Sequence, residues 1–308
     1  MVPHQTYEYC ISPQMTVAMG YLRALEKLRS TNLLYLLRQS PAMHRVAAAL
    51  DFPLTMRFAG ISFPIYASSS RNISFILSRG RLFEADERRH FAKILDMLDV
   101  RRFWDIGANI GIYGFSALSM RPFCHIVLVE PDQYNRRLLR KTIDLNRLTG
   151  VSLVEKAVSD TTGKIQFLPD DITGSAGSIF RYANGKTFAE IHYNAKITPV
   201  EVESTTLDVM LGEFGPPDFI KIDVEGAELA VFGGGRRTIT QVRPTFMFEA
   251  NLEQRQDVAW QSEIDRLLLA NQYSLFDLTT LLPIARPEFN SLAVPDEKVA
   301  AVRTALVD

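Results

Sequence analysis

The chain of 308 residues has few cysteines, no long apolar run and no recognisable export signal. Its two cysteines, Cys10 and Cys124, exclude a disulfide-stapled fold and a zinc site built from several cysteines. No apolar run approaches the ~18–20 residues that span a membrane, because Leu33–Leu37 is followed directly by Arg38 and Gln39. The first ten residues lack the basic start and apolar stretch of a secretory signal. We therefore expect a cytoplasmic protein without a membrane span.

Neither sign of charge is in excess. The chain has 34 Lys and Arg against 35 Asp and Glu, which leaves a formal net charge of −1. Because a dedicated nucleic-acid binder carries a basic face, this balance argues against a nucleic-acid partner. Hydrophobic residues make up 47% and charged residues 22% of the chain, which is typical of globular proteins. We therefore expect a globular protein that acts on a small molecule or a carbohydrate.

Residues 1–78 differ in pattern from the rest and predict an N-terminal extension. Apolar residues between Thr16 and Leu37 recur at three- and four-residue steps, which predicts an amphipathic helix. This helix either packs on its own domain or serves as a substrate lid or a homodimer contact. Between Arg57 and Leu77 the apolar residues alternate as in strands, with a turn over Ser68–Asn72, which predicts a β-hairpin.

Residues 79–308 alternate between short apolar runs and helical periodicity. Such alternation predicts an α/β domain with a Rossmann-like, mostly parallel sheet and helices on both faces. The predicted strands are Phe103–Ile106, Ile126–Val129, Ser152–Val154, Phe219–Ile222 and Thr245–Phe248. In sheets of this kind ligands bind at the carboxyl ends of the strands, so we expect the chemistry there.

A glycine-containing turn follows the first of these strands. Gly107 and Gly111 bracket it, and glycine lets a ligand approach the backbone without a side chain in the way. Asp105 suits the amino group of an amino-acid moiety, and Glu130, 19 residues after Gly111, suits the hydroxyls of a ribose. Together these residues predict a site for a nucleoside joined to an amino acid, which describes S-adenosylmethionine.

Further motifs extend this pattern along the chain. They are Asp105–Gly111, Glu130–Pro131, Ala157–Asp160, Thr206–Asp208, Ile220–Glu228, Arg243–Pro244 and Phe248–Asn251. In order and rough spacing they resemble the FkbM-like family of methyltransferases, over about residues 80–295. The resemblance implies a class I methyltransferase fold with a seven-stranded sheet. It also implies S-adenosylmethionine as cofactor, S-adenosylhomocysteine as product, and O-methylation of a hydroxyl on a sugar or secondary metabolite.

The resemblance also implies positions for the cofactor. The loop after the first strand would hold the methionine end, Glu130 the ribose, and Ala157 the adenine, with Asp160 near the adenine amino group. The full set of expected cofactor-binding residues is Glu84, Asp105, Gly107, Ala108, Asn109, Gly111, Glu130, Pro131, Ala157, Val158 and Asp223.

An alcohol that accepts a methyl group must lose its proton, for which a carboxylate or a histidine is the expected helper. Asp223 and Glu249 end neighbouring predicted strands, and Glu225 lies two residues beyond Asp223, so all three are candidate catalytic residues. The alternative for Glu225 is a charge at a helix N-terminus. His192 is a fourth candidate, in a polar segment that could be a lid. Lys221 is interpreted as a partner for a carboxylate such as Asp223.

Two further possibilities concern the acceptor side. Asp223, Glu249 and Asn251 could supply oxygen ligands to Mg²⁺, although the resemblance does not require a metal and we expect none. Ser175 and Ser178 could line the acceptor pocket.

Two rival functions stay open from the sequence. One is an NAD(P)-dependent oxidoreductase on a Rossmann sheet, but the G-x-x-x-G spacing of the loop differs from the G-x-G-x-x-G of dinucleotide binders. The other is a non-catalytic scaffold that retains the fold and uses its N-terminal extension for assembly.

Overall fold

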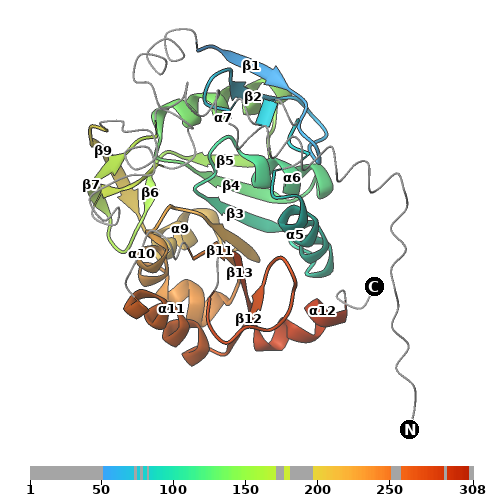
Figure 1. Ribbon diagram of the computed structural model, residues 1–308, viewed down its shortest axis with the longest axis vertical. Helices are drawn as coiled ribbons and strands as arrows, with labels where there is room; N and C mark the ends of the chain where they lie inside the picture. Colours follow the sequence, from blue (N-terminus) through green and yellow to red (C-terminus); the bar gives the residue numbers. More distant parts are fainter. Residues whose placement is uncertain are drawn as a thin grey trace, which may run out of the picture.

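A seven-stranded sheet forms the centre of the molecule (Figure 1). The computed structural model describes residues 51–72, 75–76, 79–81, 83–170, 177–180, 197–250, 258–287 and 290–304. In spatial order the strands are β12 (Tyr273–Asp277), β13 (Asn290–Pro295), β11 (Thr245–Glu249), β10 (Phe219–Ile222), β3 (Arg102–Ile106), β4 (His125–Val129) and β5 (Val151–Val154). Strand β13 is antiparallel to both neighbours, and every other neighbouring pair is parallel. The expected mostly parallel sheet is therefore confirmed.

Helices cover both faces of this sheet, because side chains alternate between the faces along each strand. Phe103 belongs to one hydrophobic cluster and Trp104 to the other, and both are fully buried. The Phe103 face is covered by α5 (Ala85–Met97), α6 (Ile112–Met120), α7 (Gln133–Asn146) and α12 (Val299–Thr304). The Trp104 face is covered by α9 (Leu207–Phe214), α10 (Glu228–Gly233), the π-helix η2 (Thr238–Val242) and α11 (Val258–Ala270). A short 3₁₀ helix, η3 (Asp296–Lys298), precedes α12.

A second, four-stranded sheet was not predicted from the sequence. Its strands are β6 (Ala157–Val158), β9 (Val200–Thr205), β7 (Gly163–Leu168) and β8 (Ser178–Ile179), in that spatial order. Strand β6 is parallel to β9, while β7 is antiparallel to both β9 and β8. Figure 1 shows this sheet beside the ends of the central strands β3 and β4.

The N-terminal hairpin is present, but its strands differ from the predicted ones. Strands β1 (Pro53–Met56) and β2 (Ile65–Ser68) pair antiparallel, and β2 lies against α7 (Figure 1). The prediction of a strand around Phe75 was wrong, because Phe75 and Ile76 are helical and the Ile76 amide donates to the Asn72 carbonyl. Phe75 instead belongs to the hydrophobic core, where its ring packs against those of Phe58 and Phe83. The domain boundary at residue 78 stays a prediction.

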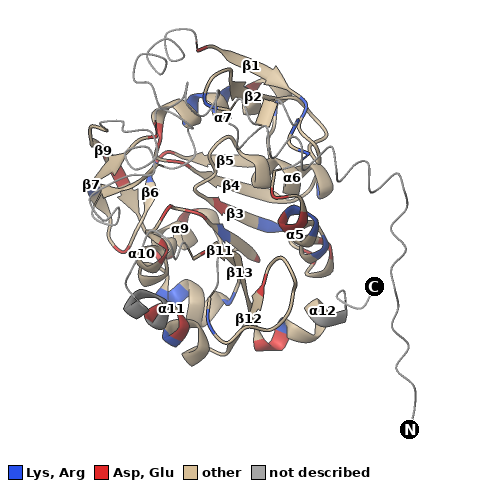
Figure 2. Ribbon diagram, in the orientation of Figure 1, with Lys and Arg blue, Asp and Glu red and all other residues tan. Residues whose placement is uncertain are grey.

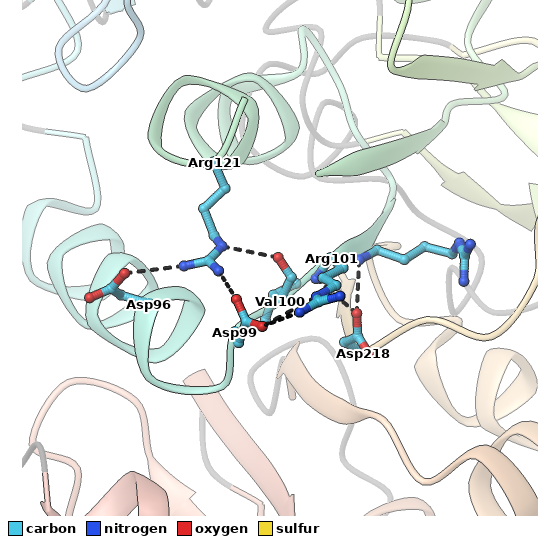
Figure 3. Close-up of polar contacts among 7 residues, drawn as sticks. Asp96, Asp99, Val100, Arg101, Arg121 and Asp218 are labelled. Atoms are coloured by element: carbon cyan, nitrogen blue, oxygen red, sulfur yellow. Dashed lines mark hydrogen bonds and ion pairs between the residues drawn. The ribbon is translucent and has the colours of Figure 1, made fainter. Parts of the chain in front are cut away.

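Arginine–aspartate contacts secure the beginning of β3, at the edge of the sheet opposite the carboxyl ends. Figure 3 shows Arg121 bound to Asp96, Asp99 and the carbonyl of Val100. One carboxylate oxygen of Asp218 accepts the backbone amides of Arg101 and Arg102, each at 2.9 Å. These bonds fix where β3 enters the sheet.

Among the described residues, no helix combines the length and apolar character needed to cross a membrane.

Candidate functional site

A cavity of about 320 Å³ opens at the carboxyl ends of β3, β4, β10 and β11. Its walls also include the β6–β9–β7–β8 sheet and the segment that follows β2. Ten residues expected from the sequence line it: Glu84, Gly107, Asn109, Glu130, Pro131, Ala157, Val158, Asp223, Glu225 and Glu249. Figure 2 shows acidic residues at the ends of these central strands. The volume lies within the ~300–1,000 Å³ range of small-molecule sites.

The loop after β3 is a tight turn held against β4. The amides of Gly107 and Ala108 both donate to the Val129 carbonyl, each at 2.9 Å. Gly107 has a φ of 80° and Gly111 a φ of 84°, in the left-handed region that favours glycine. Gly111 and Ala108 are not on the cavity wall; Gly111 instead precedes the first residue of α6.

Glu130 lies at the end of β4 and braces the loops on both sides of it. One carboxylate oxygen accepts the Asn109 amide at 2.7 Å, and the other accepts the Asp132 amide at 2.8 Å. Burial, with a smaller contribution from Asp132, raises the pKa of Glu130 to about 8. Each carboxylate oxygen can accept a second hydrogen bond, so ribose hydroxyls could bind Glu130 without displacing the backbone.

Asp105 lies beneath the loop instead of on the cavity wall, with a 1% exposed side chain. Its Oδ2 accepts the Gly114 amide at 2.9 Å, whereas its Oδ1 is buried without a hydrogen-bond partner. The Asn109 Oδ1 is also buried without a partner. Burial raises the pKa of Asp105, and the ammonium group of Lys221 opposes the rise. Of these two residues only Asn109 lines the cavity, so its unpaired oxygen is the one that fits a ligand with N–H donors.

A buried lysine connects this loop to the acceptor side of the cavity. Lys221 lies on β10 opposite Asp105, and its Nζ contacts the Asp223 Oδ2 at 2.8 Å. Burial favours a lower pKa for Lys221, but the carboxylates of Asp223, Asp105 and Glu84 outweigh it and raise the pKa. Tyr113 donates its hydroxyl to Glu84 at 2.5 Å, with its ring 4.9 Å from the lysine Nζ. The interpretation of Lys221 as a carboxylate partner is therefore confirmed.

Glu225 and Glu249 complete an acidic end of the cavity. Ile222 pairs with Phe248 in the register of β10 and β11, so Asp223 and Glu249 leave the sheet at the same level. Burial, followed by the charge of Asp223, raises the pKa of Glu249 to about 8 and that of Glu225 well above its usual range. Both carboxyl groups therefore hold a proton more tightly than an exposed glutamate does.

Several candidates lie away from these walls. Asp160 is exposed, and Ser178 is buried in β8; neither lines the cavity. His192, Ser175 and Asn251 lie outside the described residues. Within the part of the chain that the structure describes, no group of three or more His, Cys, Asp or Glu residues is arranged to hold a metal ion.

Several residues that line the cavity were not predicted from the sequence. Arg71 and Phe75 come from the N-terminal extension, Phe83 from the residues just before α5, and Phe167 and Asp170 from the second sheet and the residues after β7. None of these positions belongs to a recognisable motif, so no local signal could have placed them. Asp132 could have been found, because Asp followed by a helical run predicts an N-cap, and it accepts the amides of residues 134 and 135.

The family model described as "Methyltransferase FkbM domain" matches residues 105–275 of this chain. Two curated proteins are similar to it. The 2-O-methyltransferase NoeI of Sinorhizobium fredii is 34% identical over 147 residues, which cover 45% of this chain and 59% of NoeI. The methyltransferase sdnD of Sordaria araneosa is 28% identical over 152 residues, which cover 42% of this chain and 58% of sdnD. The chain therefore matches less than two thirds of either relative.

Among solved structures, a methyltransferase FkbM from Methylobacillus flagellatus is similar, with a TM-score of 0.42 and 17% identity. The similarity covers 73% of this chain and 48% of that one. The methyltransferase domain of METTL16 has a TM-score of 0.39 and 13% identity, covering 67% of this chain and 66% of that one.

Proposed function

The chain belongs to the FkbM methyltransferase family, and on that premise we propose that it is an S-adenosylmethionine-dependent O-methyltransferase. One observation carries the proposal: a single cavity is lined by the Gly107 turn, by Glu130 and by the carboxylates Asp223 and Glu249. These are the parts needed to hold an amino acid joined to a nucleoside and to take a proton from an alcohol.

The donor would lie along the strand ends. Glu130 would accept hydrogen bonds from the ribose, and Ala157 and Val158 would contact the adenine. The loop with Asn109 would hold the methionine end, where the unpaired Asn109 Oδ1 can accept an N–H donor. S-adenosylmethionine supplies a methyl group on a positively charged sulfur, which the nearby carboxylates would attract.

The acceptor hydroxyl would bind at the acidic end. Methyl transfer is an in-line displacement, so holding the hydroxyl in line contributes as much as ~7–11 kcal/mol. Ionised Glu249 would take the hydroxyl proton. Asp223, already paired with Lys221, would face the donor and orient the hydroxyl. Glu225 would add a third acidic group beside them.

The proposal extends to the acceptor and its setting. A small molecule or a carbohydrate is proposed as acceptor, and the similarity to a protein named a 2-O-methyltransferase supports a hydroxyl as the reacting group. Action on a nucleic acid is not proposed, because the net charge is −1. A cytoplasmic location, a homodimer through the N-terminal helices and independence of a metal remain predictions.

Binding experiments test this function against its rivals. Titration calorimetry with S-adenosylhomocysteine should give saturable 1:1 binding, and titration with NADH should give none. Binding of NADH alone would favour an oxidoreductase, and binding of neither ligand would favour a scaffold. Incubation with methyl-labelled S-adenosylmethionine and an extract of the source cell should then label the acceptor.

A further inference from the structure

Arg71 lines the cavity although it lies outside the segment that matches the family model. It belongs to the turn that follows β2, in the N-terminal part of the chain, whereas the family match begins at Asp105. Arg71 therefore adds a positive charge to the cavity from outside the segment that matches the family model.

The guanidinium of Arg71 is held in place by its neighbours. Its carbon lies 4.1 Å from the centre of the Tyr134 ring, within the range of a cation–π interaction. Its Nη1 donates to the Asp170 carbonyl at 3.5 Å. The Tyr134 hydroxyl is in turn bonded to Asp51, so the aromatic support is itself fixed. Because a guanidinium is planar, stacking on Tyr134 also sets the direction of its N–H groups.

These contacts place Arg71 at the nucleoside end of the cavity. Tyr134 is in the first turn of α7, four residues after Glu130, and Asp132 and Asn135 of the same stretch also line the cavity. The other end, with Asp223 and Glu249, is built from β10 and β11. The position of Arg71 beside α7 therefore places it near Glu130, the residue proposed to bind the ribose.

The chemistry of Arg71 suits a neutral heteroaromatic ring. A guanidinium presents a flat surface that stacks on aromatic rings and N–H donors that match ring nitrogens. We infer that Arg71 is a further donor-binding residue, which contacts the adenosine part of S-adenosylmethionine from outside the methyltransferase motifs. This inference rests on the proposed function.

Two ligands and three variants test the inference by calorimetry. S-adenosylhomocysteine carries the whole product, and 5′-methylthioadenosine carries the nucleoside without the amino acid. Arg71→Ala should weaken the binding of both ligands by about tenfold, which corresponds to the loss of one such contact. Arg71→Lys keeps a cation over Tyr134 but loses the planar group, so it should fold normally and still weaken both ligands severalfold. The control is Arg140→Ala, because Arg140 is an exposed arginine of α7 that pairs with Glu155. This substitution should change the affinity for neither ligand.

The outcomes distinguish this inference from the proposed function. Normal binding of both ligands by Arg71→Ala and Arg71→Lys would overturn the inference and leave the function intact. Weakened S-adenosylhomocysteine with unchanged 5′-methylthioadenosine would also overturn it, because Arg71 would then contact the amino-acid part. A wild-type protein that binds neither ligand would overturn both proposals. If Arg71→Ala does not fold, Arg71→Lys decides.

Discussion

Gly107 approaches Asp223 so closely that a Cβ atom on Gly107 would lie 1.8 Å from the Asp223 carbonyl oxygen. The loops that follow β3 and β10 therefore touch through their backbones. From the sequence we expected this glycine to leave room for the ligand. The structure adds a second reason, since the two loops could not both keep their positions if residue 107 had a side chain.

This contact predicts that Gly107→Ala lowers the free energy of unfolding by at least about 2 kcal/mol, because it combines overpacking with a strained positive φ. It should also weaken S-adenosylhomocysteine binding by displacing Asp223. The matched control is Gly212→Ala in α9, where a Cβ would meet nothing within 4 Å. Replacing this helical glycine should leave the free energy of unfolding unchanged or raise it by up to ~1 kcal/mol. Urea unfolding measures the stability of both variants. Equal effects would contradict the close contact between Gly107 and Asp223.

Glu130 has two tasks, and replacing it should affect both. Glu130→Ala leaves the amides of Asn109 and Asp132 without their acceptor. We expect a loss of about 1–3 kcal/mol in unfolding free energy and about 1.5–3 kcal/mol in S-adenosylhomocysteine binding. Glu201→Gln, which removes an exposed ion pair with Lys164, should change unfolding by less than about 1 kcal/mol and leave binding unchanged. An unchanged dissociation constant for Glu130→Ala would remove Glu130 from the donor site.

Glu249 should control turnover more than donor binding. Glu249→Gln removes the proposed base, so turnover with the labelled acceptor should fall by about 10²–10⁴-fold, while the affinity for S-adenosylhomocysteine changes little. Asp223→Asn should lower both, since Asp223 also faces the donor. Normal turnover in both variants and in the double variant would contradict a carboxylate base and direct attention to His192.

The raised pKa of Glu249 also predicts a pH dependence. Only the ionised carboxylate accepts a proton, and its pKa is raised to about 8 by burial and Asp223, against the opposing charge of Lys221. Turnover of the wild type should therefore rise through about pH 8 and level off above it, and Glu249→Gln should lose this rise. The contribution of Glu249 to the stability of the fold has the opposite pH dependence. A carboxyl group with a raised folded pKa stabilises most below its unfolded pKa, so its contribution declines between about pH 4.5 and 8.

Asp218 provides a prediction remote from the cavity. Its carboxylate accepts two backbone amides at the start of β3 (Figure 3), so Asp218→Ala should lower the free energy of unfolding by about 1–3 kcal/mol. Asp96→Ala in the same cluster removes a contact to Arg121 from a side chain that is 83% exposed, and should cost less than about 1 kcal/mol. Neither variant should change S-adenosylhomocysteine binding. Thermal unfolding and calorimetry measure the two effects.

Much of the site could be predicted because its residues stand next to strand ends. All five predicted strands of the central sheet are present within one residue of their expected bounds. Since parallel strands end at one edge, the motifs that follow them had to meet there. The hairpin boundaries were missed because Asn72, predicted to end the turn before a second strand, accepts the Ile76 amide and begins a helical turn instead.

The sequence alone determined the alternation of strands and helices, the glycine turn and the order of the acidic residues, since these depend on periodicity and neighbours along the chain. Only the tertiary structure decided which distant groups meet. It buried Asp105 beneath its loop and brought Arg71 to the cavity beside Tyr134. Such contacts join residues far apart in the chain, or turn a side chain into or away from a cavity, and local periodicity carries no information on either. Packing of the whole core selects them.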